Sequence, residues 1–186
     1  MRSSLPVAAI LGLVLSGLPA GGVSAQMASE SKPFSIEVRG IGMLPTFDIA
    51  DAADFGYGGG VGIGYQVNDR FRLMGDVDIA RHGTPTSGFN IDTYHYMAKA
   101  GLDVWASDKA VLTVNLGAGA VTFGGDLPES FTYLAINAGA KLGIKVAPSV
   151  ELLISPQGDI AFSKEAELGT SNSWVWPLGV GLRFKM

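Results

Sequence analysis

The stretch from residue 134 to residue 155, LAINAGAKLGIKVAPSVELLIS, alternates between aliphatic side chains and polar or small ones. Every even-numbered position up to residue 146 is aliphatic, whereas odd-numbered positions carry Asn137, Lys141 and Lys145. Successive side chains of a β-strand point to opposite faces of a sheet, so this alternation predicts strands with one aliphatic and one polar face. The segment 147–149, Ala-Pro-Ser, predicts a tight hairpin turn between two such strands.

The same period of two recurs along the chain after Gln26, where no helical periodicity competes with it. It predicts eight strands, near residues 34–44, 55–67, 71–82, 91–106, 110–123, 131–147, 150–162 and 174–184. The connections alternate between short turns at 68–70, 107–109 and 147–149 and longer loops at 45–54, 83–90, 124–130 and 163–173. Because this arrangement is typical of outer-membrane barrels, we expect an all-β fold, an eight-stranded antiparallel up-and-down transmembrane β-barrel.

The first 25 residues have the features of an export signal. Arg2 supplies the positive charge, residues 5–18 supply the apolar run, and Val23-Ser24-Ala25 supplies the small residues that a signal peptidase cleaves. We therefore expect a cleaved signal peptide at 1–25, a barrel domain at 26–186 and a final location in the outer membrane. The apolar run is short for a membrane-spanning helix, which needs about 20 residues.

Two arrangements of the faces are compatible with the alternation. A soluble, lipocalin-like periplasmic binder would turn the aliphatic face inward, whereas a membrane barrel would turn it toward lipid. Charges on the polar face balance, as an enclosed network requires, because a buried charge is costly unless it is paired. The predicted network comprises Glu37, Arg39, Arg72, Asp76, Asp78, Lys99, Asp103, Lys141, Lys145, Glu151, Asp159 and Arg183. Glycines on the same face would leave room for these side chains in a narrow barrel.

Aromatic residues on the aliphatic face concentrate near the predicted strand ends. Aromatic girdles at the two membrane interfaces are a feature of outer-membrane barrels. The predicted girdle at the end with the short turns comprises Phe34, Tyr65, Phe71 and Phe184, and the girdle at the loop end comprises Tyr57, Tyr94, Tyr96, Phe162, Trp174 and Trp176. These positions favour the arrangement with the aliphatic face in lipid.

The last predicted strand, WVWPLGVGLRFKM at 174–186, alternates in the same way and places Phe184 near the end of the chain. With the seven strands before it, the sequence resembles the small eight-stranded outer-membrane barrels, the family of the OmpA transmembrane domain, OmpX and the opacity-type adhesins. The resemblance implies partners in outer-membrane lipid, in lipopolysaccharide and in the machinery that assembles outer-membrane barrels.

The sequence contains few groups suited to catalysis. Cysteine is absent, and neither a P-loop nor a zinc-protease motif is present, so we expect no cofactor, no metal and no catalytic residue. His82 and His95 are the only histidines. Some barrels of this size modify lipid A with a histidine, a serine and a carboxylate, and Ser87, Asp76 and Asp78 are the candidate partners of His82. Because no His-x-Ser-Asn pattern is present, an enzyme is the weaker hypothesis.

The predicted loops are acidic. They carry Asp48, Asp51, Asp54, Asp126, Glu129, Glu165 and Glu167, against the single basic residue Lys164. Such carboxylates keep loops hydrated. They are also suited to divalent cations or to a basic ligand at the cell surface. The net charge of −4 gives no reason to expect nucleic-acid binding.

Three functions remain open at this point. The first is a structural or adhesion-like surface role for a barrel with a plugged polar interior. The second is a small diffusion pore, although eight strands close on their own side chains. The third is a lipid A-modifying enzyme.

Overall fold

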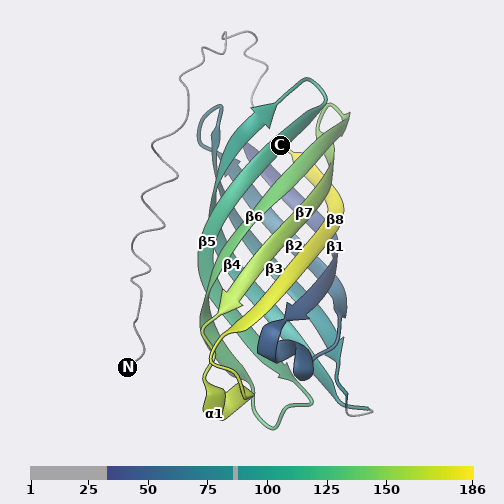
Figure 1. The fold of residues 1–186 in the computed structure, drawn as a ribbon. Coiled ribbons are helices and arrows are strands. Elements are labelled where there is room, and N and C mark those ends of the chain that lie inside the picture. The colour runs from purple at the N-terminus through teal and green to yellow at the C-terminus, as the bar shows by residue number, and fades with distance from the viewer. Residues whose placement is uncertain (1–32, 86–87) are drawn as a thin grey trace, which may run out of the picture. The chain divides into compact units, whose positions relative to one another are not determined.

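The computed structural model describes residues 33–85 and 88–186. The predicted signal peptide at 1–25 and Ser87 lie outside these described residues. Within them, eight antiparallel strands close into a single barrel in which every strand pairs with its neighbours in chain order (Figure 1). The predicted eight-stranded up-and-down barrel is confirmed. No helix among the described residues is both long enough and apolar enough to span a membrane.

The strands lie close to their predicted positions. Each has 11 to 17 residues, and about 9 to 11 residues suffice to cross a membrane at a tilt. Their bounds are β1 Phe34–Thr46, β2 Gly56–Gln66, β3 Phe71–Gly83, β4 Asn90–Ala106, β5 Ala110–Gly125, β6 Phe131–Ala147, β7 Val150–Ala161 and β8 Ser173–Lys185.

The two ends of the barrel differ in their connections. Short connections at 67–70, 107–109 and 148–149 define the turn end, where the C-terminus also lies (Figure 1). The four longer connections define the loop end, and two of them contain short helical segments, η2 at Phe47–Asp51 and α1 at Glu165–Leu168. Neither segment has a periodic hydrophobic pattern in the sequence, because a single helical turn is too short to produce one.

The aliphatic face of the barrel points outward and the polar face points inward. On β6, Leu134 is 76% exposed whereas Lys141 is fully buried. The same alternation holds on β2, where Ile63 is 66% exposed. The inverted, lipocalin-like arrangement is therefore wrong for this chain, and the outer wall is an apolar belt suited to contact with lipid hydrocarbon.

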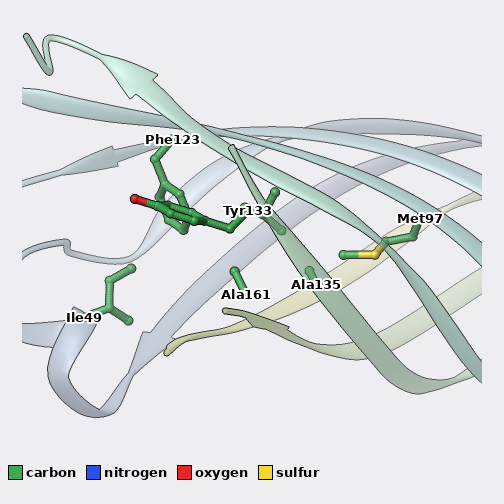
Figure 2. Packing of buried hydrophobic residues seen from close by; sticks show 7 residues of the cluster. Ile49, Met97, Phe123, Tyr133, Ala135 and Ala161 are labelled. Carbon is green, nitrogen blue, oxygen red and sulfur yellow. The ribbon is translucent and has the colours of Figure 1, made fainter. Parts of the chain in front are cut away.

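The interior is not polar along its whole length, which corrects the expected polar interior. Near the loop end, Met97, Val121, Phe123 and Tyr133 form a buried apolar cluster with Ile49 of η2 (Figure 2). A second apolar group, made of Ile41, Met43, Ala80 and Val175, lies in the same half of the strands. Here the first loop folds back so that Ile49 joins this cluster, and its side chains pack as an ordinary hydrophobic core.

Candidate functional site: a charged network across the barrel interior

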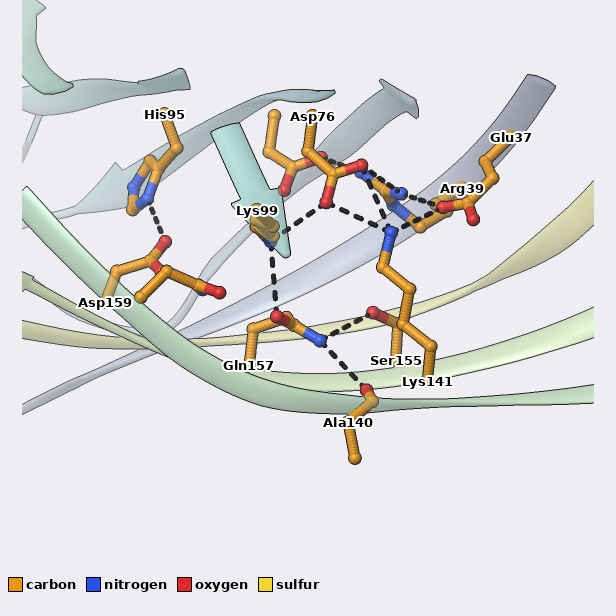
Figure 3. A network of polar contacts seen from close by, with 12 residues as sticks. Glu37, Arg39, Asp76, His95, Lys99, Ala140, Lys141, Ser155, Gln157 and Asp159 are labelled. Atoms are coloured by element: carbon orange, nitrogen blue, oxygen red, sulfur yellow. Dashed lines mark hydrogen bonds and ion pairs between the residues drawn. The ribbon is translucent and has the colours of Figure 1, made fainter. Parts of the chain in front are cut away.

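Lys141 lies at the centre of the charged half of the interior and is fully buried. Its Nζ donates to Glu37 Oε2 at 2.7 Å and to both carboxylate oxygens of Asp76 at 3.1 Å (Figure 3). Lys141 comes from β6, whereas its partners come from β1 and β3 on other sides of the barrel. One side chain thus ties three strands that are not neighbours in the sheet.

Arg39 and Lys99 extend the network. The guanidinium of Arg39 contacts three carboxylates, those of Glu37 at 2.6 Å, Asp76 at 3.1 Å and Asp78 at 2.7 Å. Lys99 Nζ lies 2.8 Å from Asp76 Oδ2. It also donates to Gln157 Oε1 at 3.2 Å (Figure 3). Gln157 was not among the predicted site residues, although its inward parity on β7 is visible in the sequence.

Arg183 of β8 connects the network to β7. Its Nε donates to Glu37 Oε1 at 2.8 Å, and its Nη1 donates to Glu151 Oε2 at 3.0 Å. Lys185, which lies at the barrel rim, also pairs with Glu151. Apart from Lys185 at the rim, the network thus joins four cations and four carboxylates, and strands β1, β3, β4, β6, β7 and β8 contribute to it.

Glycines of β2 provide the space for these charged side chains. A Cβ atom on Gly62 would lie 2.4 Å from Asp76 Oδ1 and 3.0 Å from a guanidinium nitrogen of Arg39. One on Gly60 would lie 1.8 Å from Asp78 Oδ1. Gly60 and Gly62 therefore leave room for the charged side chains, since any larger residue at these positions would displace the network.

Two predicted members lie apart from this network. Arg72 pairs with Asp103 at 2.7 Å near the turn end. The prediction that Lys145 belongs to the buried network is wrong. Its side chain is exposed, and its Nζ donates to the backbone oxygen of Ser107 at 3.3 Å. Lys145 still pairs with the buried Glu151, but it lies two residues from the end of β6, where the barrel interior opens to solvent.

The predicted residue Asp159 pairs with a histidine instead of a lysine or an arginine. Its carboxylate lies 2.6 Å from His95 Nδ1 and accepts a hydrogen bond from Asn137. His82 Nε2 lies 3.2 Å from the Thr93 hydroxyl. Both histidines are 1% exposed, so neither is accessible to a substrate from solvent.

The described residues place no serine beside either histidine, and neither Asp76 nor Asp78 contacts His82. Among the described residues, neither histidine therefore belongs to an accessible group of nucleophile, base and orienting residue of the kind that acyl transfer requires. The buried histidines act here as partners within the interior packing.

The predicted girdle aromatics all point outward, and most of them lie at strand ends. Phe34 and Tyr65 stack with ring centroids 5.0 Å apart at the turn end. The prediction that Tyr96 lies in the girdle at the loop end is wrong, because it pairs with Val77 midway along β3 and so does not lie at a strand end. Trp105, which was not predicted, is 52% exposed at the turn end, because a register shift between Asp103 and Trp105 turns it outward.

The acidic loop residues lie on three connections and do not converge. Among the described residues, no group of three or more acidic or histidine side chains could hold a metal ion. Asp126 accepts a hydrogen bond from the backbone of Asn90. Glu167 accepts one from the Tyr133 hydroxyl at 2.7 Å. The hydrogen bonds from Tyr133 and Lys164 lower the pKa of Glu167 below its usual value.

Residues 13–185 match the model of one protein family, described as the outer membrane protein beta-barrel domain. Among solved structures, Neisserial surface protein A (NspA) aligns with a TM-score of 0.68 at 16% identity, covering 82% of this chain and 97% of that one. OprG from Pseudomonas aeruginosa aligns with a TM-score of 0.58 at 13% identity, covering 84% of this chain and 96% of that one. Ail, the attachment invasion locus protein of Yersinia pestis, aligns with a TM-score of 0.51 at 20% identity, covering 83% of this chain and 99% of that one. The curated protein sequences contain no match.

Proposed function

Because the chain belongs to the outer membrane protein beta-barrel domain family, we propose that it is an outer-membrane protein with a plugged barrel and a surface-interaction role. In this proposal the apolar belt lies in the bilayer and the turn end faces the periplasm, as in other outer-membrane barrels. The loop end then faces outward from the cell. Residues 1–25 direct export, and the machinery that inserts outer-membrane barrels assembles the mature chain.

The observation that carries the plugged interior is the network of four cations and four carboxylates. Lys141 and its carboxylate partners Glu37 and Asp76 are at most 3% exposed. A continuous water channel would have to separate these charges, and breaking a buried pair by losing one partner costs about 3–5 kcal/mol. The apolar cluster closed by Ile49 adds a second obstruction nearer the loop end. Both features favour a closed barrel over a diffusion pore.

The surface role is supported by the loop end. It presents seven carboxylates, and Phe47 and Phe55 are 70% and 58% exposed there. Exposed aromatic side chains beside charged groups are common at protein interfaces. NspA is by name a surface protein and Ail an attachment invasion locus protein, and a role in surface contact is consistent with both. We propose a basic partner, to which divalent cations and lipopolysaccharide phosphates contribute further contacts.

Adhesion of whole cells tests this proposal. Bacteria would express the chain or its variant with Asp48, Asp51 and Asp54 all changed to Asn, and attachment to polylysine-coated and matrix-protein-coated surfaces would be counted with and without Mg²⁺. We expect the variant to attach less well. The matched control carries Asp69→Asn and Asp108→Asn, which change two exposed carboxylates at the turn end. Equal attachment of wild type and loop variant would overturn the surface role.

Planar-bilayer conductance tests the plugged interior separately. A closed barrel should give only small, rare openings. Large and stable conductance steps would favour the pore.

A further inference from the structure

A groove of about 640 Å³ lies on the outer wall of the barrel, over β2 and β3. Its lining side chains include Val38, Tyr57, Val61, Val77, Ile79 and Tyr94. Its volume falls within the range of about 300–1,000 Å³ that is typical of small-molecule sites. Most of its lining side chains belong to the outward-facing set of the strands, although the inward-facing Arg39 and Ala80 also line it.

The groove exists because β2 carries three successive glycines, Gly58, Gly59 and Gly60. Gly59 is the outward-facing member, and it pairs with Ile79 of β3. A Cβ atom on Gly59 would have only the backbone oxygen of Arg39 near it, at 3.4 Å. The interior network does not require a glycine at this position, so its absent side chain leaves an unfilled depression between the flanking aliphatic residues.

The loop end of the groove carries a charged group. Arg81, two residues from the end of β3, donates from Nε and Nη2 to Asp92 at 2.8 and 2.9 Å. These two bonds hold the guanidinium in place, and its side chain is nevertheless 60% exposed. In the described part of the chain no hydrogen bond uses Nη1, so one edge of the guanidinium faces outward. Asp92 occupies the bidentate fork of Arg81, which leaves Nη1 for one further hydrogen bond to a phosphate oxygen.

We propose that this groove binds one acyl chain of a phosphate-bearing lipid, with the chain over Gly58–Gly60 and the phosphate at Arg81. The depression lies in a wall that faces hydrocarbon, so acyl chains are the molecules available to fill it. The segment of β3 from Val77 to Arg81 is about 13 Å long. The acyl tail can therefore extend into the membrane while the phosphate stays near the loop end. Arg81 lies where cationic side chains meet the headgroup region.

Photo-crosslinking in vesicles tests the site. The full chain would be folded into phosphatidylcholine vesicles containing phosphatidic acid with a diazirine in one acyl chain, and labelled peptides would be mapped by mass spectrometry. We expect labelling to concentrate on residues 56–66 and 71–83. Gly59→Leu fills the groove and should lower labelling there about tenfold, the change that about 1.4 kcal/mol produces. Ile79→Trp fills it from β3 and provides a second variant.

Gly75→Leu is the matched control. Gly75 also points outward, and a Cβ atom there would lie 3.5 Å from Ile63, but it does not line the groove. This variant should keep the wild-type labelling. Each variant's folding is checked by the heat-dependent shift in its gel mobility.

The phosphate contact is tested by the charge-neutral double variant Arg81→Gln/Asp92→Asn. It should remove the preference for labelled phosphatidic acid over diacylglycerol with the same diazirine chain. Labelling spread evenly over all eight strands, or unchanged in Gly59→Leu, would overturn the site. Wild-type labelling without any preference for phosphate would overturn the role of Arg81. None of these outcomes bears on the loop-dependent adhesion proposed above.

Discussion

The two halves of the barrel interior fill their inward-facing positions differently: the turn-end half holds a network of ion pairs, and the loop-end half holds apolar clusters beside the His95–Asp159 pair. Toward the turn end, Glu37 and Lys141 belong to a network of ion pairs. Toward the loop end, Val121 and Phe123 pack in an apolar cluster. The alternation of the strands therefore decides only which side chains point inward. The chemical character of those side chains decides how the two halves respond to substitution.

The difference is one of coupling. Removing one buried charge leaves its partners without compensation, so the loss extends across several strands. Removing an apolar group leaves a cavity whose cost depends on local volume. Variants in the two halves should therefore differ both in size of effect and in additivity.

The largest effect should follow from Lys141→Met. This change leaves Glu37 and Asp76 with one cation fewer in a buried site, and we expect a loss of about 3–5 kcal/mol in the free energy of unfolding. Urea titration of the barrel in lipid vesicles, followed by gel mobility, measures it. Lys145→Met is the matched control, because its side chain is exposed, and it should change stability by less than about 0.5 kcal/mol. Equal effects of the two variants would contradict the importance of burial.

A smaller loss should follow in the apolar half. Met43 is fully buried, and Met43→Ala should cost about 2–3 kcal/mol through lost burial and the remaining cavity. The same urea titration applies. Leu44→Ala, on the outward face of β1, is the control. If Met43→Ala lost as much stability as Lys141→Met, the two halves of the interior would not differ.

Additivity sharpens the comparison further. The double variant Lys141→Met/Glu37→Gln should lose less free energy of unfolding than the sum of the two single losses. We expect a difference of about 0.5–3 kcal/mol, because the two side chains are in direct contact. Met43→Ala combined with Lys141→Met should be additive within about 0.5 kcal/mol. A double-mutant cycle in urea gives both values. Full additivity of the Glu37 pair would show that the 2.7 Å contact contributes no coupling.

The smallest effect should be a pH dependence at the loop end. Because the Tyr133 hydroxyl and Lys164 lower the pKa of Glu167, their contribution to stability is present above the usual glutamate pKa. It is lost as the pH falls through the lowered value. Tyr133→Phe should therefore reduce the difference in urea midpoint between pH 7 and pH 3. Glu165→Gln, on the same helical turn, should leave that difference unchanged.

Much of this structure could be predicted from the alternation alone. The period of two places Lys141 and Leu134 on opposite faces without any knowledge of pairing, and the balanced charges and the aromatic positions assign the polar face to the interior. The partners of Lys141 could not be predicted, because they lie on β1 and β3 and depend on register across the whole barrel. Lys145 was misplaced for another reason, since it lies two residues from the end of β6 and parity does not tell where the interior ends.

The apolar half was missed for a different reason. Val121, Phe123 and Tyr133 are inward by parity, but whether they meet water or a hydrophobic partner depends on Ile49. That residue is brought to them by a single 3-10 turn, which has no periodic signature. Loop conformation is therefore what the sequence reveals least, and it closes one end of the interior.

The contact between Arg183 and Glu37 also bears on the final step of barrel assembly. Glu37 lies on β1 and Arg183 on β8, and the two residues are directly opposed in the register at which these strands meet. If the strands closed two residues out of register, Glu37 would face Gly181 and lose its cation, or it would face Lys185 while Arg183 faced Arg39. A shift of one residue would turn every inward side chain outward. The pair therefore favours one alignment at the seam, so that a barrel closed incorrectly retains a mismatched charge and can reopen before it is released into the membrane.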